Sequence, residues 1–234
     1  MTNLFFGALR IAVLLALFDT RPQVAGLTVG GAVTYVALTQ VFLSAFSLFG
    51  WYDFMRTIHR GEVASDLLRP LNLLGFWAAQ DAGRAAGQLL LRGLPMLLLF
   101  MLFWQADLPL QPLLTLLSVV LAWVCGFAFR FLVNCAAFWW ADAVGIGRFA
   151  WAALSLGCGF LMPLALFPAW LRETLNFTPF PSMMNSSVEL WLGLRTGKAA
   201  WAALGEQLLW AVLLLALAYM VLGRGLRRLE VAGG

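Results

Sequence analysis

Charged side chains are scarce in this chain. Only 11% of its 234 residues are Asp, Glu, Lys or Arg, against about 25% in an ordinary soluble domain. Hydrophobic residues make up 62% of the chain, and its mean hydropathy is +0.88. A soluble fold could not bury so much apolar surface, so the composition predicts an integral membrane protein.

Histidine and cysteine are also rare. His59 is the single histidine, and Cys125, Cys135 and Cys158 lie in apolar runs without C-x-x-C spacing. Metal sites need several such ligands close together, so we expect no metal here. We interpret the cysteines as small packing residues, and His59 as a surface polar group rather than a general base, metal ligand or pH sensor.

Motifs that bind nucleotides are lacking as well. The segment 193–198 faintly resembles a phosphate-binding loop, but it has one residue too few between its glycines and Ala199 where Ser or Thr is needed. The net charge of +4 comes almost entirely from arginine, and we read it as a topology signal and not as a nucleic-acid-binding surface. We expect no catalytic group, no cofactor and no nucleic-acid partner for this chain.

Apolar runs fill most of the chain. A helix needs roughly 20 apolar residues to cross a bilayer, and the alternation typical of an outer-membrane barrel is absent. We therefore predict an all-α integral membrane protein with six transmembrane helices and a tight turn at residues 142–148. The expected spans are 4–18, 29–49, 89–104, 113–129 with a continuation to residue 140 left open, 149–167 and 206–222.

The first expected span is short and contains Arg10. A secretory signal peptide is the alternative for residues 4–18, but no small-x-small cleavage site clearly follows them. We expect a first span that is short, tilted or missing its beginning.

A charged stretch, residues 56–70, interrupts the apolar runs between the second and third spans. After it, residues 71–87 have an amphipathic pattern that predicts a helix at the membrane interface, with Trp77 at headgroup depth. A solvated face of an ordinary helix is the alternative, and both interpretations place the segment outside the hydrocarbon. The polar residues Gln80, Asp81, Arg84 and Gln88 are expected to face away from Leu74, Trp77 and Ala85.

The distribution of basic residues sets the orientation, because Lys and Arg accumulate on the cytoplasmic side. If the charged stretch is cytoplasmic, ten basic residues lie inside and four outside, with Arg10 unassigned, so we predict that both termini are cytoplasmic. The inner set is Arg56, Arg60, Arg69, Arg84, Arg92, Arg130, Arg148, Arg224, Arg227 and Arg228, and the outer set is Arg21, Arg172, Arg195 and Lys198.

Four polar residues lie in or near the spans: Arg92, Arg130, Asn134 and Glu206. Charges in a membrane are costly and often mark a substrate pathway. The three charged residues lie within about a turn of an expected interface, where long side chains can reach water. We favour anchoring over transport chemistry for them.

Prolines and aromatic residues interrupt the region after the fifth span. No single straight helix can contain this pattern, and short helices that enter the membrane and return fit it if they pack against protein. The residues that define this outer re-entrant segment are Pro163, Phe167, Pro168, Trp170, Pro179, Phe180 and Pro181.

Several of these stretches together resemble a known family. From about Thr34 to the end, the chain is similar to the ABC-2 family of ABC-transporter permeases, in particular a branch once catalogued as a domain of unknown function. The segments that carry the resemblance are Arg60-Gly-Glu-Val-Ala-Ser-Asp-Leu-Leu-Arg-Pro70, Gly159-Phe-Leu-Met-Pro-Leu-Ala-Leu-Phe-Pro-Ala-Trp-Leu171, Thr178-Pro-Phe-Pro-Ser182, Gln207-Leu-Leu-Trp210 and Arg227-Arg-Leu-Glu-Val-Ala-Gly-Gly234.

The resemblance implies a single permease domain over residues 1–234, with a cytoplasmic coupling loop at about 51–88 and an outer re-entrant segment at about 168–205. It implies two permease subunits, identical or different, and a pair of separate ATP-binding subunits that hold ATP and Mg²⁺. The coupling helix between spans 2 and 3 would contact these ATPases. Its residues here would be His59, Arg60, Gly61, Glu62, Asp66, Leu67, Leu68, Arg69 and Pro70.

The function that follows is that of a permease subunit in the cytoplasmic membrane of a prokaryote, which exports an amphipathic or apolar small molecule with energy from the partner ATPase. The alternatives are an ATP-independent carrier and a lipid-modifying membrane protein. A lipid-modifying enzyme would need clustered His, Asp or Glu at one membrane depth, and a carrier would need charges at the membrane midplane. The sequence has neither pattern clearly.

Overall fold

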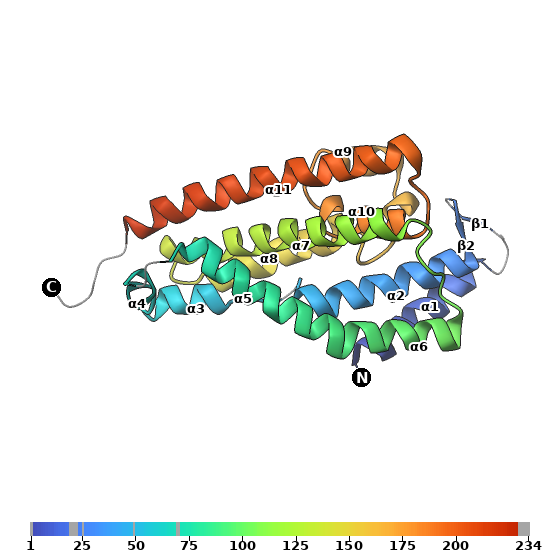
Figure 1. Cartoon of the computed structure of the whole chain (residues 1–234), viewed down its shortest axis with the longest axis horizontal. Helices are drawn as coiled ribbons and strands as arrows, with labels where there is room; N and C mark the ends of the chain where they lie inside the picture. Colours follow the sequence, from blue (N-terminus) through green and yellow to red (C-terminus); the bar gives the residue numbers. More distant parts are fainter. Residues whose placement is uncertain (1, 19–22, 25, 49, 69–70, 229–234) are drawn as a thin grey trace.

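The computed structural model describes residues 2–18, 23–24, 26–48, 50–68 and 71–228, and it is predominantly helical. The long helices lie side by side along one axis (Figure 1). We call one end of the bundle the tip end; it carries α3 (Asp53–His59), α4 (Val63–Leu67) and the last turns of α11 (Gly197–Leu226). The opposite end, the hairpin end, carries the short strands β1 (Gln23–Val24) and β2 (Leu27–Thr28).

Among the described residues, four helical segments are long and apolar enough to cross a membrane: Val29–Phe46, Leu73–Trp104, Pro112–Phe138 and Gly197–Leu226. Two shorter apolar helices, Asn3–Ala16 and Ala143–Gly157, lie where the first and fifth spans were expected. The prediction of a helical multi-pass membrane protein is thus confirmed, and the six-span arrangement stays a prediction.

Helix α2 (Val29–Phe46) occupies the centre of the bundle. About 78% of its span is buried, against 28% for α11 and 22% for the segment Leu73–Trp104. Helix α1 (Thr2–Phe18) packs along α2, and α7 (Pro112–Cys135) packs along α11. The two outer segments therefore present most of their apolar surface outward, as helices in contact with lipid do.

The third expected span and the amphipathic segment before it form one continuous helix. Helix α5 (Leu73–Gln88) passes through a π-helical turn, η1 (Leu89–Gly93), into α6 (Leu94–Trp104). The prediction of a separate interfacial helix is therefore wrong. Pro95 lies in the first turn of α6, directly after the π turn, so the extra residue of that turn accommodates the proline without ending the helix.

Helix α8 (Ala143–Gly157) corrects two further expectations. The predicted tight turn at residues 142–148 is in fact the first turns of this helix. The helix ends at Gly157, ten residues before the expected end of the fifth span. Its interior glycine, Gly147, leaves space for the Tyr52 ring, since an added Cβ there would lie 2.6 Å from Tyr52 Cε1. Gly147 therefore serves close packing and not a turn.

Between α8 and α11 the chain forms short helices near the hairpin end. They are η3 (Leu164–Leu166), α9 (Ala169–Asn176), η4 (Pro181–Met183) and α10 (Asn185–Trp191). Both η4 and α10 pack against α7 and α11, and residues 181–188 are all buried. The prolines divide the segment as predicted: Pro163 precedes η3, Pro168 precedes α9 and Pro181 begins η4.

A second, aromatic core lies at the tip end. It is built around Phe54 of α3, which is fully buried and stacks on Phe131 of α7 with ring centroids 4.6 Å apart. Trp77 of α5 packs against Phe54 at 5.3 Å and against Trp51 at 5.9 Å. Trp77 is buried within the protein, and its position at headgroup depth stays a prediction.

Candidate functional site

The predicted coupling residues lie at the extreme tip of the molecule (Figure 1). Helix α3 ends at His59, the chain turns through Arg60, Gly61 and Glu62, and α4 begins at Val63. Gly61 has a φ of +72°, a left-handed conformation that glycine adopts at little cost, so this residue type suits the turn. Val63 is buried and anchors α4 to the aromatic core.

The exposed side chains of this tip are charged and apolar. His59, Arg60 and Glu62 are exposed, with Arg60 Nη1 3.8 Å from Glu62 Oε1. His59 Nε2 lies 3.4 Å from the Trp140 carbonyl, a contact at the protein surface. Three leucines on or after α4 are also exposed: Leu67, Leu68 and Leu71. Asp66 is half-buried in α4, and the predicted coupling residues Arg69 and Pro70 lie outside the described residues.

Asn134 of α7 holds the start of α3. Its Oδ1 accepts the Met55 backbone N–H at 2.9 Å, and its Nδ2 donates to the Trp51 carbonyl at 3.0 Å and to the Arg130 carbonyl at 2.7 Å. The side chain is fully buried and its hydrogen bonds are satisfied. Because a helix begins with backbone N–H groups that have no intrahelical partner, this amide fixes α3 to α7 at a defined position.

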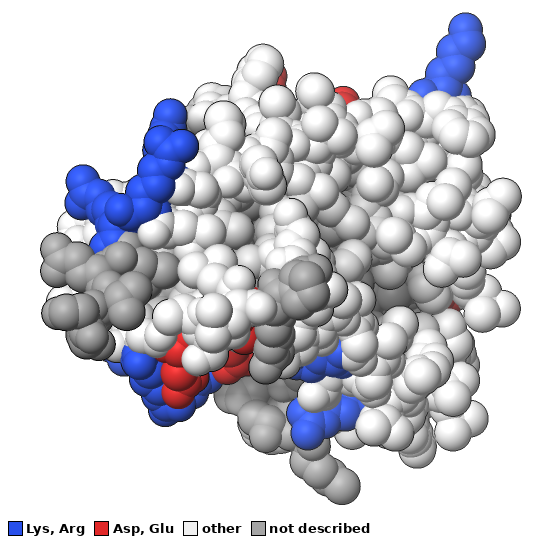
Figure 2. Space-filling model, turned by 60° about the vertical axis from the view of Figure 1, so that its left-hand side comes forward, with Lys and Arg blue, Asp and Glu red and all other residues white. Residues whose placement is uncertain are grey.

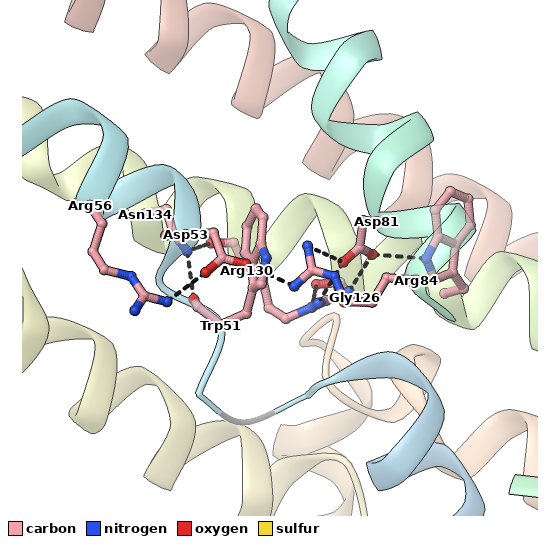
Figure 3. Close-up of polar contacts among 9 residues, drawn as sticks. Trp51, Asp53, Arg56, Asp81, Arg84, Gly126, Arg130 and Asn134 are labelled. Atoms are coloured by element: carbon pink, nitrogen blue, oxygen red, sulfur yellow. Dashed lines mark hydrogen bonds and ion pairs between the residues drawn. The ribbon is translucent and has the colours of Figure 1, made fainter. Parts of the chain in front are cut away.

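Arg130 lies four residues earlier on α7 and is fully buried. Its guanidinium makes a two-pronged ion pair with Asp81 of α5, with Nη1–Oδ1 at 3.1 Å and Nη2–Oδ2 at 2.8 Å (Figure 3). Its Nε donates to the Gly126 carbonyl at 3.1 Å, and Trp123 Nε1 donates to Asp81 Oδ2 at 3.0 Å. Both charges are thus paired and hydrogen-bonded, as buried charges need to be.

The ion-pair network continues from Asp81 to the surface. Arg84 of α5 lies 4.0 Å from Asp81 Oδ1, and its other terminal nitrogen binds Asp53 Oδ2 at 2.9 Å. Asp53, the first residue of α3, also binds Arg56 at 2.5 Å. Figure 3 shows this line of alternating charges running from Arg130 to the exposed Arg56. We call these residues, with Asn134, the coupling network.

The coupling network joins the exposed tip to two long helices. Asn134 connects α3 to α7, and the Asp53–Arg84 ion pair connects α3 to α5. Two sequence interpretations are corrected here. Arg130 does not extend toward an interface but is enclosed by protein, and Asp81 shares the buried face of α5 with Trp77 and Ala85 instead of opposing them. No local pattern indicated this pairing, because Asp81 lies in an amphipathic segment and Arg130 follows 49 positions later.

A second buried polar cluster joins α11 to the short helices near the hairpin end. Gln207 of α11 accepts from Ser118 Oγ at 2.7 Å and donates to the Ser182 carbonyl at 2.9 Å. Ser118 Oγ also lies 2.8 Å from Ser187 Oγ. These residues connect α7, η4, α10 and α11 and hold the predicted re-entrant segment against the spans. The segment's outermost aromatic residues, Trp170 and Phe177, are exposed.

The irregular backbone after α8 receives hydrogen bonds from two other helices. Tyr35 of α2 donates to the Gly159 carbonyl at 2.8 Å, with Asn185 Oδ1 at 3.0 Å from the same hydroxyl. Arg10 of α1 donates to the carbonyls of Phe160 and Leu161. Backbone without helical hydrogen bonds is tolerated among membrane spans only where such partners exist.

The remaining predicted residues of this segment are packing and helix-boundary residues. Phe180 packs edge-on against Phe129 at 5.6 Å and covers Gly157, where an added Cβ would lie 2.7 Å from Phe180 Cδ2. Phe167 follows η3, and Pro179 precedes η4. The three cysteines are buried free thiols. Within the described ranges, no group of three His, Cys, Asp or Glu residues could hold a metal ion.

The comparison with known protein families bears on this arrangement. A family model described as "ABC-2 family transporter protein" matches residues 4–233, nearly the whole chain. Searches of curated proteins and of solved structures gave no match. With a full-length family match, four long apolar helices and the arrangement described above, the chain belongs to the ABC-2 family of transporter proteins.

Proposed function

We propose that this chain is the permease subunit of an ATP-driven exporter of an amphipathic or apolar small molecule, and that a separate pair of ATP-binding subunits docks on its tip. Membership of the ABC-2 family supports a permease subunit. On this proposal the partner subunits bind ATP and Mg²⁺, and a second permease subunit, identical or different, completes the pathway.

The observation that carries the docking site is the row of exposed leucines at the tip. Leu68 is 87% exposed, and Leu67 and Leu71 are also largely exposed, next to the charged residues Arg60 and Glu62. An apolar patch surrounded by charges is typical of protein–protein interfaces. The tip lies at the far end of the bundle from the strands, so it is accessible to a protein on one side of the membrane.

The charges at the two ends support a cytoplasmic tip. Figure 2 brings the tip end forward and shows basic side chains at its edges, with most of the visible surface uncharged. Lys and Arg accumulate on the cytoplasmic side of a membrane, so the basic tip favours a cytoplasmic location for this end of the bundle. We propose six spans with both termini on the cytoplasmic side of a prokaryotic cytoplasmic membrane. The exposed basic residues near the tip are Arg56, Arg60, Arg224, Arg227 and Arg228.

The coupling network suggests how ATP binding would act on the spans. Movement of the docked subunits would displace α3 and α4. Asn134 and Asp53 would then transmit this displacement to α7 and to the continuous α5–α6 helix. Both of these helices extend to the hairpin end, where the short helices pack against α7. Shifts of packed helices of this kind are a common form of transporter rearrangement.

The test is a comparison of two equally exposed apolar residues at opposite ends. The full chain is co-expressed with each candidate ABC ATP-binding subunit of its source genome, and complex formation is measured by co-purification and by titration in detergent. We expect Leu68→Asp to weaken the complex at least tenfold without changing the thermal stability of the permease. Phe177→Asp, at a residue 84% exposed near the hairpin end, should leave the complex unchanged.

Two results would contradict the proposal. Equal affinity of the Leu68 variant and the native chain would exclude the tip as the docking site. Transport by the chain alone in vesicles, without any ATP-binding subunit, would instead favour an ATP-independent carrier.

A further inference from the structure

A polar pocket of ≈270 Å³ opens beside α3 at the tip end. The residues that line it are spaced three and four positions apart, so they share one face of this helical segment. They are Asp53, Arg56, Thr57 and Arg60. The pocket is smaller than the roughly 300–1,000 Å³ of typical small-molecule sites, and each lining residue is polar or charged. These features do not suit an apolar cargo, and they suit one polar side chain of another protein.

The ion pairs around this pocket leave one positive charge in excess among the described residues. Four arginines share three carboxylates in these pairs: Arg56, Arg60, Arg84 and Arg130 with Asp53, Glu62 and Asp81. The two inner arginines have further partners, because the guanidinium carbons of Arg84 and Arg130 each lie 5.6 Å from the Trp51 ring centroid. The excess charge therefore falls on the two outer arginines, Arg56 and Arg60.

Both outer arginines are accessible and have donors to spare. The side chain of Arg56 is 61% exposed and that of Arg60 is 67% exposed. Arg56 bonds to Asp53 through one terminal nitrogen, at 2.5 Å, whereas Arg60 Nη1 lies 3.8 Å from Glu62 Oε1, too far for a hydrogen bond. A guanidinium group has five N–H donors. Within the part of the chain that the structure describes, each of these two groups thus keeps N–H donors that have no acceptor.

We propose that an exposed Asp or Glu side chain of the docked ATP-binding subunit enters this pocket and binds Arg56 and Arg60. The inference rests on the proposed function, in which that subunit docks on the tip. One carboxylate carries one negative charge, which balances the excess, and its two oxygens match the planar guanidinium group. An acidic membrane surface fits less well, because its many negative charges would also face Asp53 and Glu62.

The carboxylate would bind at the outer end of the coupling network. Asp53 contacts both Arg56 and Arg84, so the new contact extends the line of alternating charges from the buried Arg130 into the docked subunit (Figure 3). The subunit would then be attached to the network by charge as well as to the exposed leucines of the tip. This attachment explains why the network ends in a basic residue at the surface.

The test measures the affinity between the full chain and the ATP-binding subunit that co-purifies with it, in detergent without added lipid. We expect Arg56→Glu/Arg60→Glu to weaken the complex at least tenfold, because like charges would then face the carboxylate. Arg56→Gln/Arg60→Gln removes the charges without adding repulsion, and should weaken the complex about threefold and make its affinity less sensitive to salt. If the first variant does not fold, the second still decides the matter.

A matched control changes an arginine at the same end of the bundle. Arg224 is exposed in the last turn of α11. Arg224→Glu alters the net charge in the same direction, and it should change the affinity less than twofold. A similar loss in this variant and in Arg56→Glu/Arg60→Glu would show that net charge alone controls binding, and would overturn the inference.

The occupant of the pocket is identified by reciprocal rescue. Each exposed Asp and Glu of the ATP-binding subunit is changed in turn to Arg. One such change should weaken binding to the native chain and restore binding to Arg56→Glu/Arg60→Glu to within about threefold of the native affinity. If none of them restores it, no carboxylate of the subunit occupies the pocket and the inference fails.

The results also separate this inference from the proposed docking site. Native affinity in Arg56→Glu/Arg60→Glu overturns the inference, and docking on the tip stands if Leu68→Asp still weakens the complex. If neither variant changes the affinity, docking on the tip fails and this inference fails with it. An effect of the arginine variants that appears only after phosphatidylglycerol is added to the detergent would assign the pocket to acidic lipid headgroups, and would also overturn the inference.

Discussion

Arg130 of α7 and Asp81 of α5 pair through two contacts, 3.1 and 2.8 Å long, at a place that solvent hardly reaches. Removing two charges from water is expensive, and their attraction repays this cost only when the geometry is good and the remaining polar atoms are bonded. Both conditions hold, because Gly126 and Trp123 satisfy the remaining donor and acceptor. The pair therefore holds α5 and α7 in a defined relative position. Its net contribution to the free energy of folding is small.

Removal of one member of this pair should be far more harmful than removal of both. We expect Arg130→Met to lower the free energy of unfolding by about 3–5 kcal/mol, because Asp81 would remain as an uncompensated buried charge. The double variant Asp81→Leu/Arg130→Met should recover most of this loss. Thermal and denaturant unfolding of the purified protein in detergent measures both effects.

The matched control for these two variants is the exposed ion pair at the other end of the coupling network. Arg56 and Asp53 have side chains 61% and 41% exposed, and such pairs contribute about 0–1 kcal/mol. Arg56→Met should therefore have little effect on stability. If the double variant is no more stable than Arg130→Met, the unpaired charge of Asp81 is not the cause of the loss in that single variant.

Asn134 gives a prediction about coupling. Asn134→Leu removes the acceptor of the Met55 N–H and the donor to the Trp51 carbonyl, at a cost of about 1–3 kcal/mol, and releases α3 from α7. On the proposed function, an ATP-binding subunit that docks on the tip should still bind with native affinity, because the exposed tip residues are unchanged. The amount of cargo transported per ATP hydrolysed should then fall severalfold, as measured in vesicles that contain the permease and that subunit.

Asn134→Asp is a second variant at this position. It keeps an oxygen for the Met55 N–H but places a buried carboxylate against the Trp51 and Arg130 carbonyls, so it should impair coupling at least as much as Asn134→Leu. Native coupling in Asn134→Leu would remove Asn134 from the proposed path between the tip and α7.

The sequence predicted the helices better than their contacts. Periodicity correctly indicated a helix over most of residues 71–87, but the residues with which it packs lie far away in the chain. Asp81 is buried because Arg130, 49 positions later, neutralises it, and no local pattern contains that information. Where the decisive feature was local, as with the prolines that divide residues 163–181, the expected short helices were found, and their entry into the membrane stays a prediction.

Gln207 should be important for the position of the short helices near the hairpin end. Gln207→Leu leaves the Ser182 carbonyl without its partner and removes the acceptor of the Ser118 hydroxyl, in a cluster that is fully enclosed. We expect a loss of about 1–3 kcal/mol in the free energy of unfolding. The neighbouring Glu206→Gln weakens only an exposed contact with Arg195 and should cost less than about 1 kcal/mol. Similar losses in the two variants would contradict this role.

Two glycines of α8 provide a comparison within one helix. An alanine at position 147 would place its Cβ 2.6 Å from Tyr52 Cε1, whereas at position 145 no atom lies within 4 Å. We expect Gly147→Ala to destabilise the protein by about 1–3 kcal/mol through overpacking against Tyr52. Gly145→Ala should instead stabilise it by about 0.5–1 kcal/mol, because alanine favours a helix interior.

The cause of the Gly147 effect can be tested with the partner ring. Tyr52 packs on Trp151 with ring centroids 4.1 Å apart, so Tyr52→Leu alone should also be destabilising. If the clash with the ring is responsible, Gly147→Ala combined with Tyr52→Leu should cost less than the sum of the single variants, since the smaller leucine leaves space for the new methyl group. Strict additivity would show that the alanine acts on α8 in some other way than through Tyr52.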